Sequence, residues 1–327
     1  MEPPFQISSH ILRHVSEIER LIGRLEGFDQ PTPQPHLRKS NRIRTVQGSL
    51  AIEGNTLNLD QVTALIEGKP VVGDRSEIQE VKNAIKAYDR MHRFKPDSVQ
   101  SLLDTHRIMM SRLIPSAGKW RSGSVGILRG TEVSHLAPPA DKVPYLMGTL
   151  FEFLKTNDHH ELIKSAVFHY ELEFIHPFED GSGRIGRFWH SLLLTQYHPV
   201  FEFTPVESLI KANQGEYYKA LETADRSGES TAFIEFSLDM VRQALADLIG
   251  AIRPGRTTPQ GRLERAHAHF QGAQFSRKDY LNLHKMISTA TASRDLKSGV
   301  TAGILTKQGL QALTVYRFLN PTSLRAF

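Results

Sequence analysis

The sequence predicts a mainly α-helical protein with one short β element and a separate basic C-terminal region. Apolar residues recur every three or four positions in residues 77–90 and 160–175, which is the spacing of an amphipathic helix. Strand patterns are scarce, and the clearest is a short hairpin formed by residues 124–128 and 131–136. Positive charge is concentrated near the C-terminus.

Two segments rich in proline or glycine divide the chain. Residues 29–35 carry proline at alternate positions, which favours an extended path, and residues 251–261 combine Pro, Gly and Thr. We expect an N-terminal helical region in residues 1–94, a helical core in 95–250, a linker in 251–261 and a C-terminal domain in 262–327.

Composition excludes several kinds of chemistry. The 327 residues contain no cysteine, so disulfides, thiolate metal sites and thiol nucleophiles are ruled out. No apolar run approaches the roughly 20 residues that cross a bilayer, and the first 15 residues carry charged side chains where a signal peptide needs an apolar run. We expect a soluble, cytoplasmic protein with no membrane partner.

The densest group of polar residues is the segment 176–187, HPFEDGSGRIGR, which links two helical patterns. Gly181 and Gly183 allow a tight loop whose N–H groups, with the start of the next helix, can hold a phosphate. Arg184 and Arg187 could bind a di- or triphosphate, and Asp180 could hold magnesium. His176 has the pKa range of a general base.

Each of these residues also has an ordinary structural explanation. A histidine before proline often ends a helix, Asp-Gly is a common turn, and arginines three apart commonly lie on a wet helix face. Their combination within twelve residues favours a phosphate-binding active site.

This segment resembles the signature of Fic-domain proteins, HPFx(D/E)GNGRxxR, with Ser182 where the family usually has Asn. The resemblance implies a Fic-type helical core that transfers AMP from ATP to a Ser, Thr or Tyr hydroxyl of a protein target. His176 would be the catalytic base and Asp180 the ligand of Mg²⁺ or Mn²⁺. Gly181, Ser182, Gly183, Arg184 and Arg187 would bind the phosphates of ATP, and the shorter Ser182 side chain could lengthen one contact.

The resemblance extends to both sides of the signature. Residues 120–127 and 138–140 are similar to the hairpin flap that positions a target segment in the family. Asn213, in NQGEYY, lies in a segment similar to the one that closes over the nucleotide, and is a candidate ribose or adenine contact. The adjacent tyrosines could equally be core residues.

Residues 49–55, SLAIEGN, match the Fic inhibitory motif (S/T)xxxE(G/N), which implies that Ser49 and Glu53 belong to an inhibitory helix. Glu53 would pair with Arg187 and deny ATP its γ-phosphate contact. The same residues also suit a helix end capped by Gly54 and Asn55. We also expect auto-modification. Because Glu53 lies where it could orient water, we further expect the enzyme to remove AMP from its target under some metal or oligomer condition. A homodimer that buries the inhibitory segment would be a reasonable regulatory arrangement, although the sequence does not specify the oligomeric state.

The region 251–327 carries 12 Lys and Arg against 3 Asp and Glu, a net charge of +9. Its pattern of three helices and a hairpin resembles a winged helix, with Thr291, Ser293, Arg294 and Lys297 on the candidate recognition helix. A basic module of this kind suits DNA, although winged helices also dock proteins. The favoured function is therefore an autoinhibited protein adenylyltransferase. The alternative is a DNA-binding regulator with a weakly active or nucleotide-sensing Fic-like core.

Overall fold

The computed structural model describes residues 3–26, 35–129, 132–252, 259–284, 287–309 and 314–319, without the side chains of 127–135 and 268. The chain forms two compact units, residues 1–252 and 253–327. Helices dominate the first unit, and strands are few in both, so the predicted mainly α fold is confirmed.

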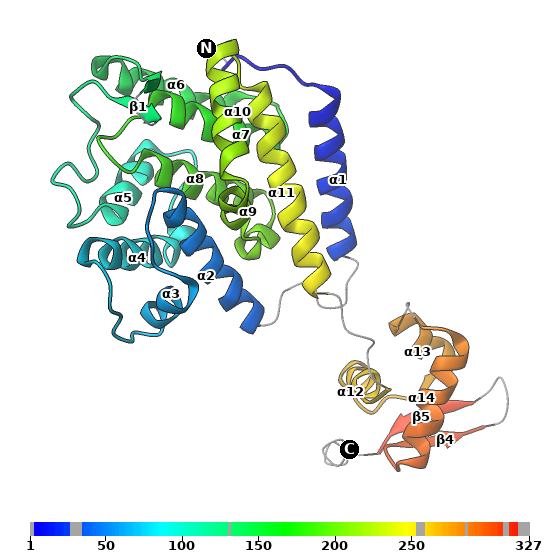
Figure 1. Ribbon diagram of the computed structural model, residues 1–327. Helices are drawn as coiled ribbons and strands as arrows, with labels where there is room; N and C mark the ends of the chain where they lie inside the picture. Colours follow the sequence, from blue (N-terminus) through cyan, green and yellow to red (C-terminus); the bar gives the residue numbers. More distant parts are fainter. Residues whose placement is uncertain are drawn as a thin grey trace. The chain divides into compact units, whose positions relative to one another are not determined.

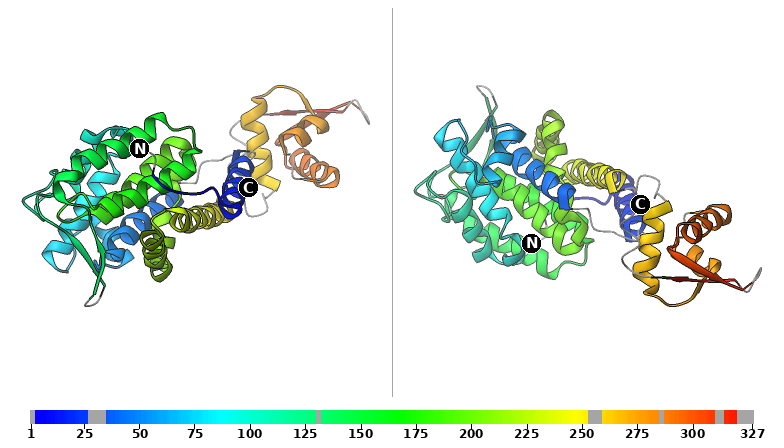
Figure 2. Two further views of the ribbon diagram at one scale, coloured as in Figure 1. Left: turned by 90° about the horizontal axis from the view of Figure 1, so that it is seen from above. Right: turned by 90° about the horizontal axis from the view of Figure 1, so that it is seen from below.

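Helices α1 to α4 come from the N-terminal third of the first unit (Figure 1). Helix α1 lies beside α11 along one side of the unit, and the hairpin lies at the opposite end (Figure 2). The contact is apolar because α1 buries a stripe that includes Ile11, Ile18 and Leu25. The elements are α1 (Ser9–Glu26), α2 (Pro35–Ile52), α3 (Leu59–Ile66), α4 (Arg75–Tyr88) and the short 3₁₀ helix η1 (Met91–Arg93).

The centre of the first unit is the packed pair α7 and α8. Phe168 from α7 and Phe188 and Trp189 from α8 are completely buried, and the Trp189 indole N–H donates to the carbonyl of Pro96. The remaining elements are α5 (Val99–Met109), β1 (Gly126–Arg129), β2 (Glu132–Leu136), η2 (Ala140–Lys142), α6 (Val143–Thr156), α7 (Glu161–Ile175), α8 (Ser182–Tyr197), η3 (Pro199–Phe203), α9 (Val206–Ala212), α10 (Gln214–Ser227) and α11 (Thr231–Ile252).

The predicted elements agree well with these bounds. The helical patterns at 77–90 and 160–175 correspond to α4 and α7. The predicted hairpin is β1 paired antiparallel with β2, with Gly126 opposite Leu136 and a bulge between Ile127 and Leu128. Of the predicted segment 29–35, only Pro35 is described, and it begins α2.

Helix α2 ends in a Schellman motif that fixes the position of Glu53. The N–H of Asn55 donates to the carbonyl of Leu50, and that of Gly54 donates to Ala51. Gly54 has φ +94°, a conformation that glycine adopts without strain. Glu53 therefore directly follows the last residue of α2, where its side chain can reach a neighbouring helix.

The second unit has its own small core of Leu263, Phe275, Tyr280 and Leu296 with their neighbours. Its strands pair antiparallel in the order β3-β5-β4. Its elements are α12 (Pro259–Phe270), β3 (Phe275–Ser276), α13 (Arg277–Leu283), α14 (Thr289–Thr301), β4 (Leu305–Gln308) and β5 (Val315–Phe318). A capping box is present at the start of α13, where the side chains of Ser276 and Asp279 each accept the other residue's backbone N–H.

The predicted linker 251–261 is too long at both ends. Ala251 and Ile252 continue α11, and residues 259–261 already belong to α12; residues 253–258 lie outside the described ranges. Proline is tolerated at the first position of a helix, so Pro259 begins α12 where the sequence pattern indicated a break. Within the described ranges, none of the helices combines the length and apolar character needed to cross a membrane.

Gly48 provides a test of the packing between α2 and α9. A Cβ on Gly48 would lie 2.9 Å from the backbone carbon of Glu207 and the backbone nitrogen of Ser208. Because backbone atoms cannot move aside cheaply, we expect Gly48→Ala to destabilise the protein by about 1–3 kcal/mol and to lower its Tm by several degrees. The matched control is Gly23→Ala in α1, where a Cβ meets no atom within 4 Å and Tm should not fall. Equal melting of the two variants would contradict this packing.

Candidate active site

The signature segment forms the tight connection from α7 to α8. His176 ends α7 in the left-handed conformation with φ +47°, and Gly181 precedes α8 with φ +90°. A Cβ on Gly181 would lie 2.7 Å from the Met110 sulfur, so the loop packs closely on the end of α5. The loop therefore brings His176, Asp180 and the first turn of α8 together, as the sequence predicted from their spacing.

His106 of α5 holds this loop in place through a hydrogen bond to its backbone. Its Nδ1 accepts the N–H of Gly118, so its Nε2 carries the proton and donates to the carbonyl of Asp180 at 2.9 Å. Its ring stacks on Phe178 with centroids 3.7 Å apart. Burial lowers the pKa of His106 to about 4, which keeps it neutral at pH 7.

Arg121 ties the flap segment to the same loop. Its Nε donates to the carbonyl of His176 at 2.7 Å, and a terminal nitrogen donates to Ile175 at 3.2 Å. The guanidinium also bonds to the carbonyls of Gly123 and Pro138. One buried arginine thus fixes the backbone of His176 and both ends of the flap.

The predicted partner of Arg187 is present at hydrogen-bond distance. Nη2 of Arg187 lies 2.6 Å from Oε1 of Glu53, and the Arg187 side chain is only 1% exposed. Ser49 contributes twice, because its carbonyl accepts from Nη2 at 3.0 Å and its hydroxyl accepts from Nε at 3.3 Å. Burial alone would raise the pKa of Glu53, but the charge and hydrogen bond of Arg187 outweigh burial and lower it.

The Glu53 carboxylate lies against the first turn of α8. A Cβ on Gly183 would lie 2.5 Å from Oε1 of Glu53 and 3.1 Å from Nη1 of Arg187. The start of a helix attracts anions through its N–H groups and its dipole. Glu53 therefore lies where the sequence predicted a phosphate cradle.

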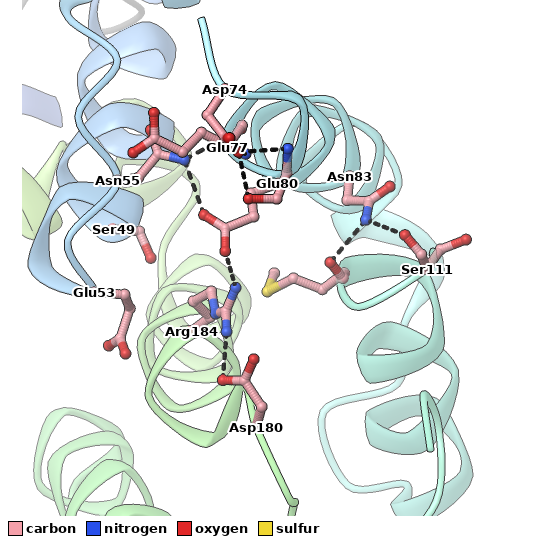
Figure 3. A network of polar contacts seen from close by, with 12 residues as sticks. Ser49, Glu53, Asn55, Asp74, Glu77, Glu80, Asn83, Ser111, Asp180 and Arg184 are labelled. Carbon is pink, nitrogen blue, oxygen red and sulfur yellow. Dashed lines mark hydrogen bonds and ion pairs between the residues drawn. The ribbon is translucent and has the colours of Figure 1, made fainter. Parts of the chain in front are cut away.

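Arg184 lies between two carboxylates (Figure 3). Its Nη2 is 2.6 Å from Oδ1 of Asp180, and its Nη1 is 2.9 Å from Oε1 of Glu80 in α4. Its Nε is buried and has no hydrogen-bond partner among the described residues. An unmatched buried donor is costly, so this nitrogen is suited to bind an additional anionic ligand.

Two predicted nucleotide contacts have other partners here. The Ser182 hydroxyl is buried and accepts the N–H of Phe178 at 3.2 Å, so its short side chain turns back into the loop. The Asn213 amide donates to the carbonyl of Leu209 at the end of α9. The Asn213 amide donors are therefore taken, whereas the Ser182 oxygen serves here as an acceptor.

The segment around Asn213 contacts the end of α2. Lys211 donates to the carbonyl of Ala51 at 2.8 Å, and Gln214 donates to Ile52 at 2.9 Å. Tyr218 also reaches the carbonyl of Ile52. The Ala51 carbonyl already accepts the N–H of Gly54, so Lys211 is its second donor, and Gln214 and Tyr218 both reach the carbonyl of Ile52. These contacts hold the end of α2 in place.

The remaining predicted site residues, Thr291, Ser293, Arg294 and Lys297, lie on α14 of the second unit. Sequence reasoning missed Glu80 and His106 altogether. Neither lies in a recognisable motif, and each meets the loop across more than 70 residues of chain. Among the described residues, no three His, Asp or Glu side chains gather closely enough to hold a metal by themselves.

The helical fold and the glycine-containing loop between α7 and α8 define a class of helical domain, and comparisons with known proteins identify that class. Residues 96–194 match the Fic/DOC family. The chain is 37% identical to a Fic family protein from Desulfovibrio desulfuricans G20, and the match covers 98% of this chain and 99% of that one with a TM-score of 0.75. The chain therefore belongs to the Fic family.

Curated relatives include "Protein adenylyltransferase Fic" of Culex quinquefasciatus, 29% identical over 222 residues. Another is "Protein adenylyltransferase fic-1" of Caenorhabditis elegans, 29% identical over 266 residues. These matches cover 63% and 76% of this chain but only 41% and 48% of the relatives. The chain thus matches less than half the length of these relatives.

The ion pair of Glu53 and Arg187 predicts a pH-dependent stability. The folded-state pKa of Glu53 lies below its usual value of 4.5. The ion pair therefore stabilises the fold above pH 4.5, and this stabilisation is lost as the pH falls through the lowered pKa. We expect Glu53→Gln to melt below wild type at pH 7, and the gap in Tm to shrink toward pH 3. Glu216→Gln, at an exposed position on α10, is the control. A gap that stays constant from pH 7 to pH 3 would be evidence against the pair.

Proposed function

We propose that this chain is a protein adenylyltransferase that transfers AMP from ATP to a hydroxyl side chain of a protein, including its own, and that Glu53 inhibits it. The observation that carries the proposal is the position of Glu53 in the cradle, paired with Arg187. A carboxylate at the site of a phosphate is what competitive inhibition in cis requires. The names of the curated relatives support the same reaction.

The reaction needs a base, an anion cradle and a fixed target segment. In the proposed step the target hydroxyl attacks the α-phosphorus of ATP. The new O–P bond forms as the bond to the bridging oxygen of the β-phosphate breaks, and diphosphate leaves with the electron pair. His176 would take the hydroxyl proton, and its backbone is held by Arg121.

The arginines and the first turn of α8 would stabilise the phosphates. Arg187 would bind the terminal phosphate once Glu53 withdraws, and Arg184 would offer its unmatched Nε–H. The backbone N–H groups of Gly181, Ser182 and Gly183 would contribute, while the Ser182 oxygen accepts the N–H of Phe178.

Asp180 is the residue suited to hold magnesium or manganese. Its side chain is half exposed, and magnesium commonly takes one or two carboxylates and completes its shell with phosphate oxygens and water. Such an ion would neutralise negative charge on the departing diphosphate. Before binding it, Asp180 would have to loosen its ion pair with Arg184.

Removal of AMP by the same site, which the sequence analysis also expects, would use Glu53 to orient a water molecule. This second activity stays a prediction.

Transfer is tested by mass spectrometry of protein incubated with ATP and magnesium. We expect Glu53→Gly to gain an AMP adduct well above the wild-type level, because Arg187 is freed for phosphate. The matched control is the double variant Glu53→Gly/His176→Ala, which should show no adduct because it lacks the base. Equal labelling of wild type and Glu53→Gly would contradict inhibition by Glu53. Equal labelling of Glu53→Gly and the double variant would contradict the role of His176.

A second function, DNA binding through a winged-helix-like second unit, is favoured by the surface of α14. Arg294 and Lys297 are exposed and line a surface depression of about 390 Å³, together with Ser298 and Thr301. Thr291 and Ser293 lie at the start of the same helix. The net charge of +9 in residues 251–327 adds a long-range attraction for phosphates.

DNA binding is tested by fluorescence anisotropy with a duplex of about 20 base pairs over a range of salt concentrations. We expect Arg294→Ala/Lys297→Ala to weaken binding and to reduce the slope of log K against log salt by about 1.8, because each phosphate contact contributes about 0.9. Lys219→Ala, an exposed lysine of α10, is the control. An unchanged slope in the α14 variant would contradict DNA binding by this surface and would favour a protein partner.

A further inference from the structure

Glu80 is an acidic residue beside the active site to which no role has yet been given. It lies in α4, and its side chain is 22% exposed. Its Oε1 accepts from Nη1 of Arg184 at 2.9 Å, and Arg184 itself is 4% exposed. A buried guanidinium needs a compensating negative charge, and Glu80 is the better buried of its two carboxylate partners.

The second oxygen of Glu80 is bound by the inhibitory segment. Nδ2 of Asn55 donates to Oε2 of Glu80 at 2.8 Å (Figure 3). Asn55 is itself fixed, because Nδ2 also donates to the carbonyl of Glu77 and Oδ1 accepts the N–H of Leu57. Asn55 also closes the Schellman motif of α2. A continuous chain of bonds thus runs from the end of α2 through Glu80 to Arg184 and on to Asp180.

Glu80 differs from Glu53 in its relation to the cradle. Glu53 lies against the Gly183 position, where a phosphate would bind. The atoms nearest the Gly181 and Gly183 positions come from Met110, His106, Glu53 and Arg187, and none comes from Glu80. Figure 3 shows Glu80 and Asp180 on opposite sides of Arg184. Glu80 therefore holds Arg184 from outside the cradle and leaves its Nε–H without a partner among the described residues.

We propose that Glu80 is a positioning residue for Arg184 and that Asn55 orients Glu80, an inference that rests on the proposed binding of ATP phosphates by Arg184. The end of α2 then has two opposite effects on one site. Glu53 blocks the phosphates, whereas Asn55, two residues later, helps to build the site that receives them. Loss of Glu53 and loss of the whole segment should consequently differ in effect.

The test measures nucleotide binding in the Glu53→Gly background, where the cradle is free. Equilibrium dialysis with labelled ATP plus magnesium, and separately with labelled adenosine, compares Glu80→Gln with its parent. Glutamine keeps the shape of Glu80 but lacks its charge. When its oxygen accepts from Arg184, its NH₂ group faces the NH₂ group of Asn55, and neither of these can accept a hydrogen bond. We expect roughly tenfold weaker binding of ATP, because hydrogen bonds between charged groups are the stronger ones, and unchanged binding of adenosine.

The matched control is Glu77→Gln, one turn earlier on α4. Both oxygens of the Glu77 side chain bind Thr56, so this residue also holds the segment after α2 but does not contact Arg184. It should leave the affinity for ATP within twofold of the parent. Thermal melting of each variant checks that the fold is intact.

Asn55→Asp provides a second, independent variant. It keeps the acceptor for Leu57 but presents a carboxylate to Glu80, so ATP binding should weaken here as well. In the double variant Asn55→Asp/Glu80→Gln, the glutamine NH₂ group can donate to the aspartate carboxylate, so a hydrogen bond between positions 55 and 80 is restored with its direction reversed. The double variant should therefore bind ATP more tightly than the product of the two single effects predicts.

Three results would overturn the positioning role: ATP affinity of Glu80→Gln within twofold of the parent, tighter ATP binding, or equal weakening of ATP and adenosine. Tighter binding would mean that Glu80 competes with phosphate. The binding measurements stand apart from transfer. If the Glu53→Gly protein binds ATP without forming an AMP adduct, the proposed reaction is wrong, while the ratio of ATP affinities still supports Glu80 as the positioning residue.

Discussion

The ion pair between Arg187 and Glu53 is the interaction on which the arrangement of the site depends. Arg187 is buried in α8, at the centre of the first unit, and a buried guanidinium without a partner would be strongly destabilising. In this state the partner is a carboxylate from α2, supported by both oxygens of Ser49. The fold thus pairs Arg187, the arginine proposed to bind phosphate, with a carboxylate of its own. The same ion pair places Glu53 against the first turn of α8.

Further buried or partly buried side chains hold the loop between α7 and α8 and the start of α8. His106 holds the carbonyl of Asp180, Arg121 holds that of His176, and Glu80 holds Arg184. These contacts connect the loop and the first turn of α8 to α5, to the segment around Arg121 and to α4, so residues distant in sequence hold the site. Sites held this way keep their donors in place before a ligand arrives, which is the condition for electrostatic stabilisation of developing charge.

The family resemblance implied one long-range contact, the pair of Glu53 and Arg187, but otherwise the sequence predicted local features and missed long-range ones. The motif from His176 to Arg187 and the cap at Gly54 and Asn55 depend on residues close in sequence, so spacing alone revealed them. Glu80 and Arg184 are 104 positions apart, and no local pattern marks their contact. The sequence does not specify the loop conformation, so it could not show that the Ser182 oxygen accepts the N–H of Phe178. Strand β3 has two residues, too few to produce an alternating pattern.

The contacts of α2 indicate how the cradle can open at least cost. Moving the helix end would break the bonds from Lys211 and Gln214 to its last carbonyls, the link from Asn55 to Glu80, and the close packing of Gly48 on α9. Rotating the Glu53 side chain, which is 32% exposed, breaks only its bond to Arg187 among the contacts of the described residues, and in the proposed reaction a nucleotide phosphate would take its place. The charge-assisted bond from Arg187 to Glu53 would then be exchanged for one from Arg187 to phosphate, which is of similar strength. Rotation of the side chain therefore costs less free energy than movement of the end of α2. The α2 backbone, with Asn55 still bound to Glu80, can therefore stay in place while the cradle is emptied.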